Sequence, residues 1–243
     1  GVNAGNSIAS GGNYNTVVGD EAGTALTTGD GNVAVGFEAL KTEDAHGRNT
    51  AMGYQALKTL NAGAEGVTTT IGYQAGTSLT TGVQNTLIGG LSGDALTDAD
   101  YNVAVGNNTL SSDTKGSKSI AIGYEALVSQ NFSTSTDSFN VAMGFQAGAA
   151  VTTGIQNTLI GGLAGDAITT ANYNVAVGYN AAGSSTTGHS NSVLGRHALK
   201  NNTTGSNNVA IGRDALEANT TADDNTALGY NTLTANTTGA SNT

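Results

Sequence analysis

The sequence has no cysteine, no proline and no tryptophan among its 243 residues, and only 11% of them are charged. Without cysteine there is no disulfide and no thiolate metal site, and the redox compartment cannot be inferred. No run of about 18 apolar residues is present, so no transmembrane helix is expected. The first residues also lack the basic-then-apolar pattern of a signal segment.

Basic residues are scarce as well, with 8 Lys and Arg against 18 Asp and Glu, which gives a formal net charge of -10. That charge argues against electrostatic binding to nucleic acid or to an anionic membrane. Acidity and low lysine content favour an extracellular location. Glycine is abundant, with 36 residues, and aliphatic residues recur steadily. This composition favours a stack of turns and short strands over a disordered chain.

One pattern, Asn-x-small-aliphatic-Gly, recurs along the whole chain. We number its Asn as position 1 and its Gly as position 5, and we call all residues at one position a column. The Gly spacing is 17 residues in ten of the twelve intervals, and 19 and 21 in the other two. Thirteen units cover residues 15–241, a partial unit covers 1–14, and 242–243 begin a fourteenth. We expect one elongated repeat domain over residues 1–243, with modules of about four units, as a segment of a longer fibre.

The unit predicts an all-β fold. No window has the spacing of an amphipathic helix, and segments such as "NVAVG" are typical of a short strand closed by a glycine turn. Each unit then forms one 17-residue rung of a parallel β-solenoid or β-roll, hydrogen-bonded to the next rung about 4.8 Å away. Thirteen rungs would extend roughly 60 Å.

Positions 4 and 5 are the most regular. We predict that the position 4 residues form the core and that the position 5 glycines supply a turn with positive φ or a close backbone approach. The predicted core column is Val18, Val35, Met52, Ile71, Ile88, Val105, Ile122, Met143, Ile160, Val177, Leu194, Ile211 and Leu228. The predicted turn column is Gly19, Gly36, Gly53, Gly72, Gly89, Gly106, Gly123, Gly144, Gly161, Gly178, Gly195, Gly212 and Gly229.

Three further regularities lead to structural predictions. Position 1 is Asn in eleven units, so its side-chain amides are expected to form a ladder. In most units position 9 is Leu where position 12 is polar, and Gly where position 12 is apolar, as if one large side chain fills one place in the core; Leu57 with Leu60 and Ala182 with Ser185 depart from this rule. The two longer units place insertions in "LNAGAEGVTTT" and "VSQNFSTSTDSFN", which we expect to project from one corner of the solenoid.

The repeat resembles a known type. "NVAVGFEAL", "NTAMGYQALK" and "RHALKNNTTGSNNVAIGRDALEANTT" are similar to repeats of phage tail-fibre-like and bacterial surface proteins, which often end in an endosialidase-type chaperone domain. They are more loosely similar to the head of YadA-type trimeric autotransporter adhesins. The resemblance covers essentially the whole chain. It implies a homotrimer and a role in surface attachment or host recognition. A thin core also favours assembly into a homotrimeric fibre, and a single-chain solenoid stays open.

Catalysis finds little support in the sequence. His46, His189 and His197 have no acid partner at a matching position, and we interpret them as surface residues. The acidic pairs do not recur in one column and lack the spacing of calcium-binding rolls, and "GDGN" and "GGLSGD" lack a P-loop lysine. We therefore predict no enzyme activity, no cofactor and no metal. A polysaccharide-degrading β-helix is a distant alternative.

Position 6 carries a broken series of aromatic residues, which would either stack on glycan rings or pack against a turn or a neighbouring chain; we favour packing. The recurrent Thr-Thr pairs predict hydrogen bonds in turns and ladders rather than an ice-binding face.

The sequence thus predicts a non-enzymatic extracellular fibre segment, on a cell surface or virion, that mediates attachment or recognition. Its partners would be copies of itself and a cell-surface glycan or protein. The candidate receptor contacts are Glu65, in the first insertion, and Phe132 and Phe139, in the second. A purely structural filament without its own ligand is the alternative.

Overall fold

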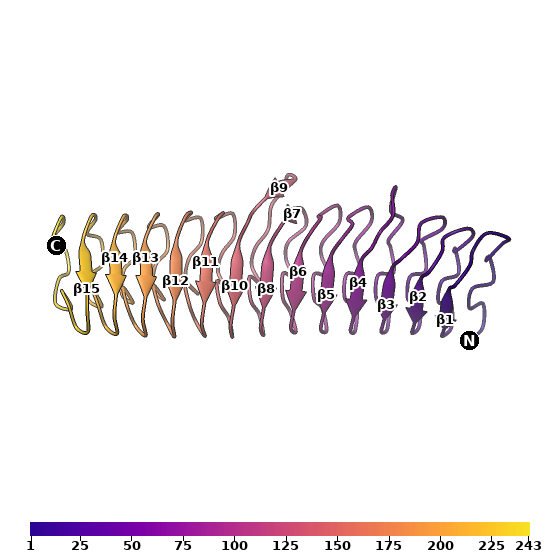
Figure 1. Cartoon of the computed structure of the whole chain (residues 1–243), viewed down its shortest axis with the longest axis horizontal. Coiled ribbons are helices and arrows are strands. Elements are labelled where there is room, and N and C mark those ends of the chain that lie inside the picture. Colours follow the sequence, from indigo (N-terminus) through magenta and orange to yellow (C-terminus); the bar gives the residue numbers. More distant parts are fainter. The chain divides into compact units, whose positions relative to one another are not determined.

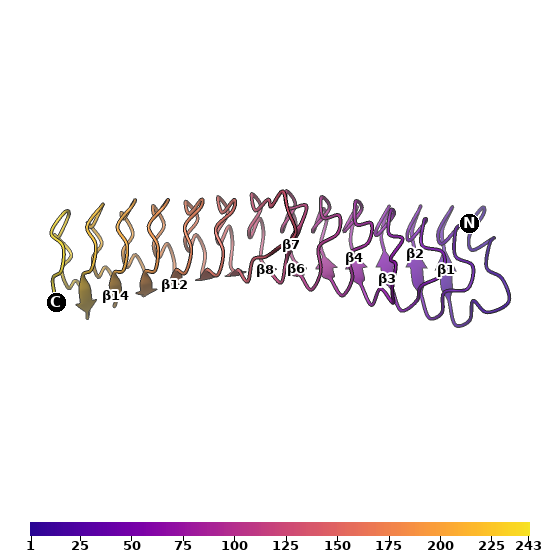
Figure 2. The same ribbon diagram turned by 90° about the horizontal axis from the view of Figure 1, so that it is seen from above.

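The computed structural model describes residues 1–243, and all of its regular structure is β-strand. It divides into two compact units, the first made of Gly1–Ser119 with Asn131–Thr136 and the second of Ile120–Gln130 with Asp137–Thr243. Each unit is a parallel β-solenoid with rungs of 17 residues, which confirms the predicted fold class (Figures 1 and 2). No helix long and apolar enough to cross a membrane is present.

The first unit stacks one three-residue strand per rung, in chain order. Its strands are β1 (Thr16–Val18), β2 (Val33–Val35), β3 (Thr50–Met52), β4 (Thr69–Ile71), β5 (Thr86–Ile88) and β6 (Val103–Val105). Neighbours pair in parallel with equivalent positions opposite each other, including Thr50 opposite Thr69 across the 19-residue unit. The first insertion is therefore accommodated outside the sheet.

The second unit repeats this arrangement. Its strands are β8 (Ile120–Ile122), β10 (Val141–Met143), β11 (Thr158–Ile160), β12 (Val175–Val177), β13 (Ser192–Leu194), β14 (Val209–Ile211) and β15 (Thr226–Leu228). Ile120 pairs with Val141 across the 21-residue unit. Two short strands, β7 (Gly116–Ser117) and β9 (Thr136–Asp137), form a separate two-stranded sheet at the second insertion.

The strand residues that face the core are those of position 3, and the prediction that position 4 forms the core is wrong. Ala34, Ala104 and Leu159 at position 3 are fully buried, whereas Met52 and Leu194 at position 4 are 40% and 51% exposed. Successive strand residues point to opposite faces, so only one of the two columns can face inward. Position 3 is alanine in most rungs, and leucine lies there where position 9 beside it is glycine, as at Leu159 beside Gly148 and Gly165.

The predicted exchange between positions 9 and 12 is confirmed in most rungs, and in one exception Leu57 and Leu60 are both fully buried. Leu40 and Leu127 at position 9, and Leu79 and Ile168 at position 12, are all fully buried. The polar residues at position 12 are also buried, and they hydrogen-bond to the corner that follows. For example, Asn202 Nδ2 donates to the Gly205 carbonyl at 2.9 Å.

The predicted asparagine ladder is present. In the second unit the backbone N–H of Asn174 donates to Asn157 Oδ1 at 3.0 Å, and Asn174 Nδ2 donates to the Gly188 carbonyl at 3.0 Å. The same pair of bonds links later rungs, as at Asn191. The corner backbone is buried and has no access to water, so these amides supply its hydrogen bonds instead.

The glycine column is also confirmed. Gly36 has φ of +136°, and a Cβ on it would collide with the backbone carbonyl of Gly53 in the next rung. Both features require glycine, because any side chain there would push neighbouring rungs apart.

Three other columns, at positions 7, 9 and 17, have positive φ without requiring glycine. Glu38, Leu40 and Tyr101 have φ of 52°, 49° and 60°, and equivalent residues repeat these values along the chain. This left-handed conformation is rare outside glycine and asparagine. The strand–turn pattern of the sequence does not predict it.

Candidate functional site

The outer face of each sheet is uncharged, with an apolar residue at position 4 of every rung and an aliphatic residue, threonine or serine at position 2. Positions 2 and 4 both point outward, and no unit carries a charged residue at either position. Exposed members include Met52 and Ile71 in the first unit and Met143, Val175 and Leu194 in the second. We call this surface the sheet face. An exposed apolar surface that repeats on every rung is typical of an interaction surface rather than of scattered exposed residues.

Beside the sheet face, the aromatic residues of position 6 stack on one another along the column. In the first unit Phe37, Tyr54 and Tyr73 form a continuous stack, with ring centroids 5.3 and 5.4 Å apart. In the second unit Tyr124 and Phe145 are 5.5 Å apart with nearly parallel planes. The rings remain about half exposed. They thus pack on neighbouring rungs of the same chain and still present a surface.

A charged network lies at positions 7 and 10 of the first unit. Lys41 and Lys58 contact the Glu38 carboxylate at 2.6 and 2.7 Å, and Gln55 Nε2 donates to it at 2.7 Å. These hydrogen bonds lower the pKa of Glu38 to about 2, and the one from Lys41 has the largest effect. Lys41 also pairs with Glu21, and the two carboxylates raise the pKa of Lys41. The network links three successive rungs.

Both insertions reach beyond the other loops at the upper edge in Figure 1, as predicted. Each is held by a buried carboxylate at position 12 of the preceding rung. Glu43 is fully buried, and its Oε2 accepts a hydrogen bond from the backbone N–H of Ala62, in the first insertion, at 3.0 Å. Its Oε1 accepts the N–H of His46 at 3.1 Å.

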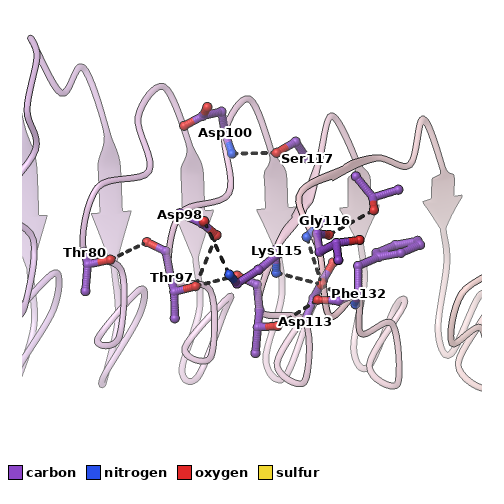
Figure 3. Close-up of polar contacts among 12 residues, drawn as sticks. Thr80, Thr97, Asp98, Asp100, Asp113, Lys115, Gly116, Ser117 and Phe132 are labelled. Atoms are coloured by element: carbon purple, nitrogen blue, oxygen red, sulfur yellow. Dashed lines mark hydrogen bonds and ion pairs between the residues drawn. The ribbon is translucent and has the colours of Figure 1, made fainter.

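Asp113 holds the second insertion in the same way (Figure 3). Its Oδ1 accepts the N–H groups of Gly116 at 3.0 Å and of Phe132 at 3.2 Å. Thr114 Oγ1 donates to the Phe132 carbonyl at 2.9 Å. Lys115 and Asp98 pair nearby at 3.7 Å.

The structure separates the three predicted receptor contacts. Phe132 is only 6% exposed, and its ring Cδ2 would lie 2.8 Å from a Cβ on Gly116, so its prediction as a receptor contact is wrong. An aromatic residue at the base of a loop gains more from burial than from exposure. Phe139 is 49% exposed, and Glu65 is exposed and 3.6 Å from Arg48. The three residues do not form one site.

The histidines have acid neighbours that sequence reasoning missed. His46 Nδ1 is 3.4 Å from Glu43 Oε1, and His197 Nδ1 is 3.6 Å from Asp214 of the next rung. With Asp44 and Glu217 respectively, these make two groups whose ligand atoms lie within 4.8 Å of one another. In the first group Glu43 already accepts backbone hydrogen bonds from two corners, which accounts for its burial.

The threonine pairs form the predicted ladders. Thr80 Oγ1 donates to the Thr97 carbonyl at 3.0 Å, and Thr97 repeats this bond to Thr114 (Figure 3). The two carboxylate anchors could have been found from the sequence, because Glu43 and Asp113 are the acids of position 12 and each precedes an insertion.

Comparisons with models of protein families, with curated protein sequences and with solved structures found no match to this chain.

Proposed function

We propose that the chain is a non-enzymatic segment of an extracellular fibre that assembles with copies of itself and mediates attachment to a surface. The sheet face is the observation that carries this proposal. Its side chains are uncharged on every rung and apolar at position 4, with threonine or serine at position 2 of seven rungs, while the net charge of -10 resides elsewhere on the chain. Burying such a face against an identical face removes apolar area from water without desolvating a charge.

The thinness of the core supports self-assembly. Position 3 is alanine in most rungs, and most of the larger aliphatic side chains of position 4 point outward. An isolated solenoid with this arrangement buries little apolar area per residue, and small cores gain stability from neighbouring chains. A parallel homotrimer, as the repeat resemblance implies, places three sheet faces together.

The experiment for assembly is analytical ultracentrifugation of the purified chain. We expect a trimer, and we expect the double variant Ile71→Lys with Met143→Lys, which charges the sheet face of both units, to sediment as a monomer. The matched control is Thr77→Lys with Ala149→Lys, at position 10, where Lys41 and Lys58 occur naturally. A wild-type chain that stays monomeric at high concentration contradicts the assembly proposal.

Attachment requires a second measurement. The labelled chain should bind to at least one member of a panel of bacterial and animal cells, and the shortened variant that lacks the second insertion tests whether that loop carries the contact. If wild-type chain binds to none of the cells although it assembles, the purely structural filament becomes the better description. The exposed Phe139 and Glu65 are the loop residues to substitute first.

A further inference from the structure

The aromatic column of the second unit is interrupted at one rung. Phe145, Gly162 and Tyr179 occupy position 6 of the successive rungs that carry β10, β11 and β12. Phe145 stacks on Tyr124 with an interplanar angle of 13°, so its opposite ring face is turned toward the rung of Gly162. Phe145 and Tyr179 are 54% and 52% exposed.

The space over Gly162 holds no side chain from its own rung. A Cβ there would meet no atom closer than Tyr179 Cδ2, at 3.6 Å, which is ordinary van der Waals contact. The equivalent position in the first unit, Gly90, is covered, because Asn107 Nδ2 donates to the Gly90 carbonyl at 3.1 Å and would lie 3.0 Å from a Cβ. Gly162, unlike Gly90, has an aromatic residue at position 6 of both neighbouring rungs, Phe145 and Tyr179, and it leaves a gap between them.

The width of the gap is suited to one six-membered ring. Phe145 and Tyr179 are two rungs apart, which is about 9.5 Å at the usual strand spacing. The same two-rung separation holds the ring of Tyr54 between Phe37 and Tyr73, with centroids 5.3 and 5.4 Å apart. A chair-shaped sugar ring is also six-membered, and its C–H groups can contact an aromatic face while its hydroxyls remain in water.

No residue at positions 4, 6 or 7 of these three rungs is charged, which favours a neutral sugar over an anionic one. The residues at positions 4, 6 and 7 of these three rungs are Met143, Phe145, Gln146, Ile160, Gly162, Leu163, Val177, Tyr179 and Asn180. The amides of Gln146 and Asn180 flank the gap on the neighbouring column. Gln146 Nε2 donates to Glu125 Oε2 at 2.8 Å, and the Gln146 carbonyl and the Asn180 amide are of the kind that hydrogen-bond sugar hydroxyls.

We propose that the gap over Gly162 binds one neutral hexopyranose ring of a glycan, held between the ring faces of Phe145 and Tyr179. This deepens the proposed attachment function and rests on it for its biological role. The sugar takes the place of the aromatic side chain that this rung lacks.

The decisive variant is Gly162→Tyr, which fills the gap with the residue that position 6 carries elsewhere. Gly162 has no positive φ, and its Cβ would have room, so the variant should fold with a higher melting temperature. The probes are methyl glucopyranoside, methyl galactopyranoside and methyl mannopyranoside, observed by saturation-transfer NMR on the full chain. We expect at least one to bind to wild type, and Gly162→Tyr to weaken that binding at least tenfold. Phe145→Ala should weaken it similarly.

Gly90→Tyr is the matched control and should leave sugar binding unchanged, since its neighbour Asn107 already covers that position. Binding that persists in Gly162→Tyr, or a wild type that binds none of the three sugars, overturns the inference. Cell attachment that is the same in wild type and Gly162→Tyr also overturns it while leaving the proposed function intact. Sugar binding without cell attachment would instead count against the proposed function.

Discussion

At the scale of single residues, the least expected feature is backbone conformation. Positions 7, 9 and 17 require positive φ in every rung, yet the sequence fills them with Glu, Gln, Leu and aromatic residues as well as Asn. Each such residue costs stability that the surrounding hydrogen bonds must offset. Val67 is the extreme case, because it is β-branched with φ of 44°.

Val67→Asn should therefore stabilise the chain by about 1 kcal/mol, since asparagine tolerates the left-handed region better than a β-branched residue does. Val67 is 48% exposed, so little apolar burial is lost. Urea denaturation measures the change. Val83→Asn, at a valine with ordinary φ in the next rung, should give no gain; an equal gain there would refute the conformational explanation.

Glu38 makes stability dependent on pH. Its pKa in the folded chain is about 2, below its ordinary value of 4.5, so its contribution is complete above about 4.5 and is lost as pH falls toward 2. Glu38→Gln should lower stability by about 1 kcal/mol at pH 7 and have a shrinking effect as pH falls from 4.5 to 2.5. Denaturation midpoints at several pH values test this. A deficit that is the same at all pH values would mean that packing, and not charge, is responsible.

At the scale of the rung, much of the structure follows from the sequence. The strand at positions 2–4, the glycine turn, the asparagine ladder and the exchange between positions 9 and 12 could all be predicted from periodicity. The inward face could not, because alternation identifies two faces without saying which is buried. The prediction from side-chain size at position 4 failed, since the buried column is the one that holds alanine in most rungs, as at Ala34 and Ala104.

The insertions show the same limit. The spacing of the glycines shows where the insertions lie. The roles of their residues depend on contacts that the repeat pattern does not predict. Phe132 is conspicuous in the sequence and turns out to be the base of its loop, while Phe139 is exposed. The anchors lie a whole rung earlier, at Glu43 and Asp113.

Asp113→Ala should release the second insertion without unfolding the solenoid. It removes the acceptor of the Gly116 and Phe132 N–H groups and should cost about 2–3 kcal/mol, because buried donors are left unpaired. Hydrogen exchange should accelerate at both amides while the β2–β4 amides stay protected. Asn202→Ala, which removes a polar anchor at position 12 where no insertion follows, is the control. Unchanged exchange at Phe132 would disprove the anchoring role.

At the scale of the molecule, the two kinds of surface differ in chemistry. The sheet face is free of charge, and the charged groups, such as Glu38 with Lys41 and Lys58, lie on other columns. An assembly held through the sheet face is hydrophobic, and an assembly held through the charged columns is electrostatic. The two respond to salt in opposite ways.

Self-association should therefore persist when ionic strength rises from about 0.1 M to about 1 M, which shortens the Debye length from about 10 Å to about 3 Å. Sulfate should strengthen it, because it favours burial of apolar surface. Sedimentation equilibrium across the salt series provides the measurement. Dissociation at high salt would assign the interface to the charged columns instead.

The corner that carries the insertions has a consequence for engineering. Extra residues leave the sheet register intact, as the pairing of Thr50 with Thr69 shows. A carboxylate one rung earlier fastens the added segment. A foreign peptide could thus be grafted at the same corner of another rung, such as the one that begins at Asn85. Leu79→Asp would supply the fastening, and Gly76→Leu would refill the core, which makes the solenoid a programmable scaffold for peptide display.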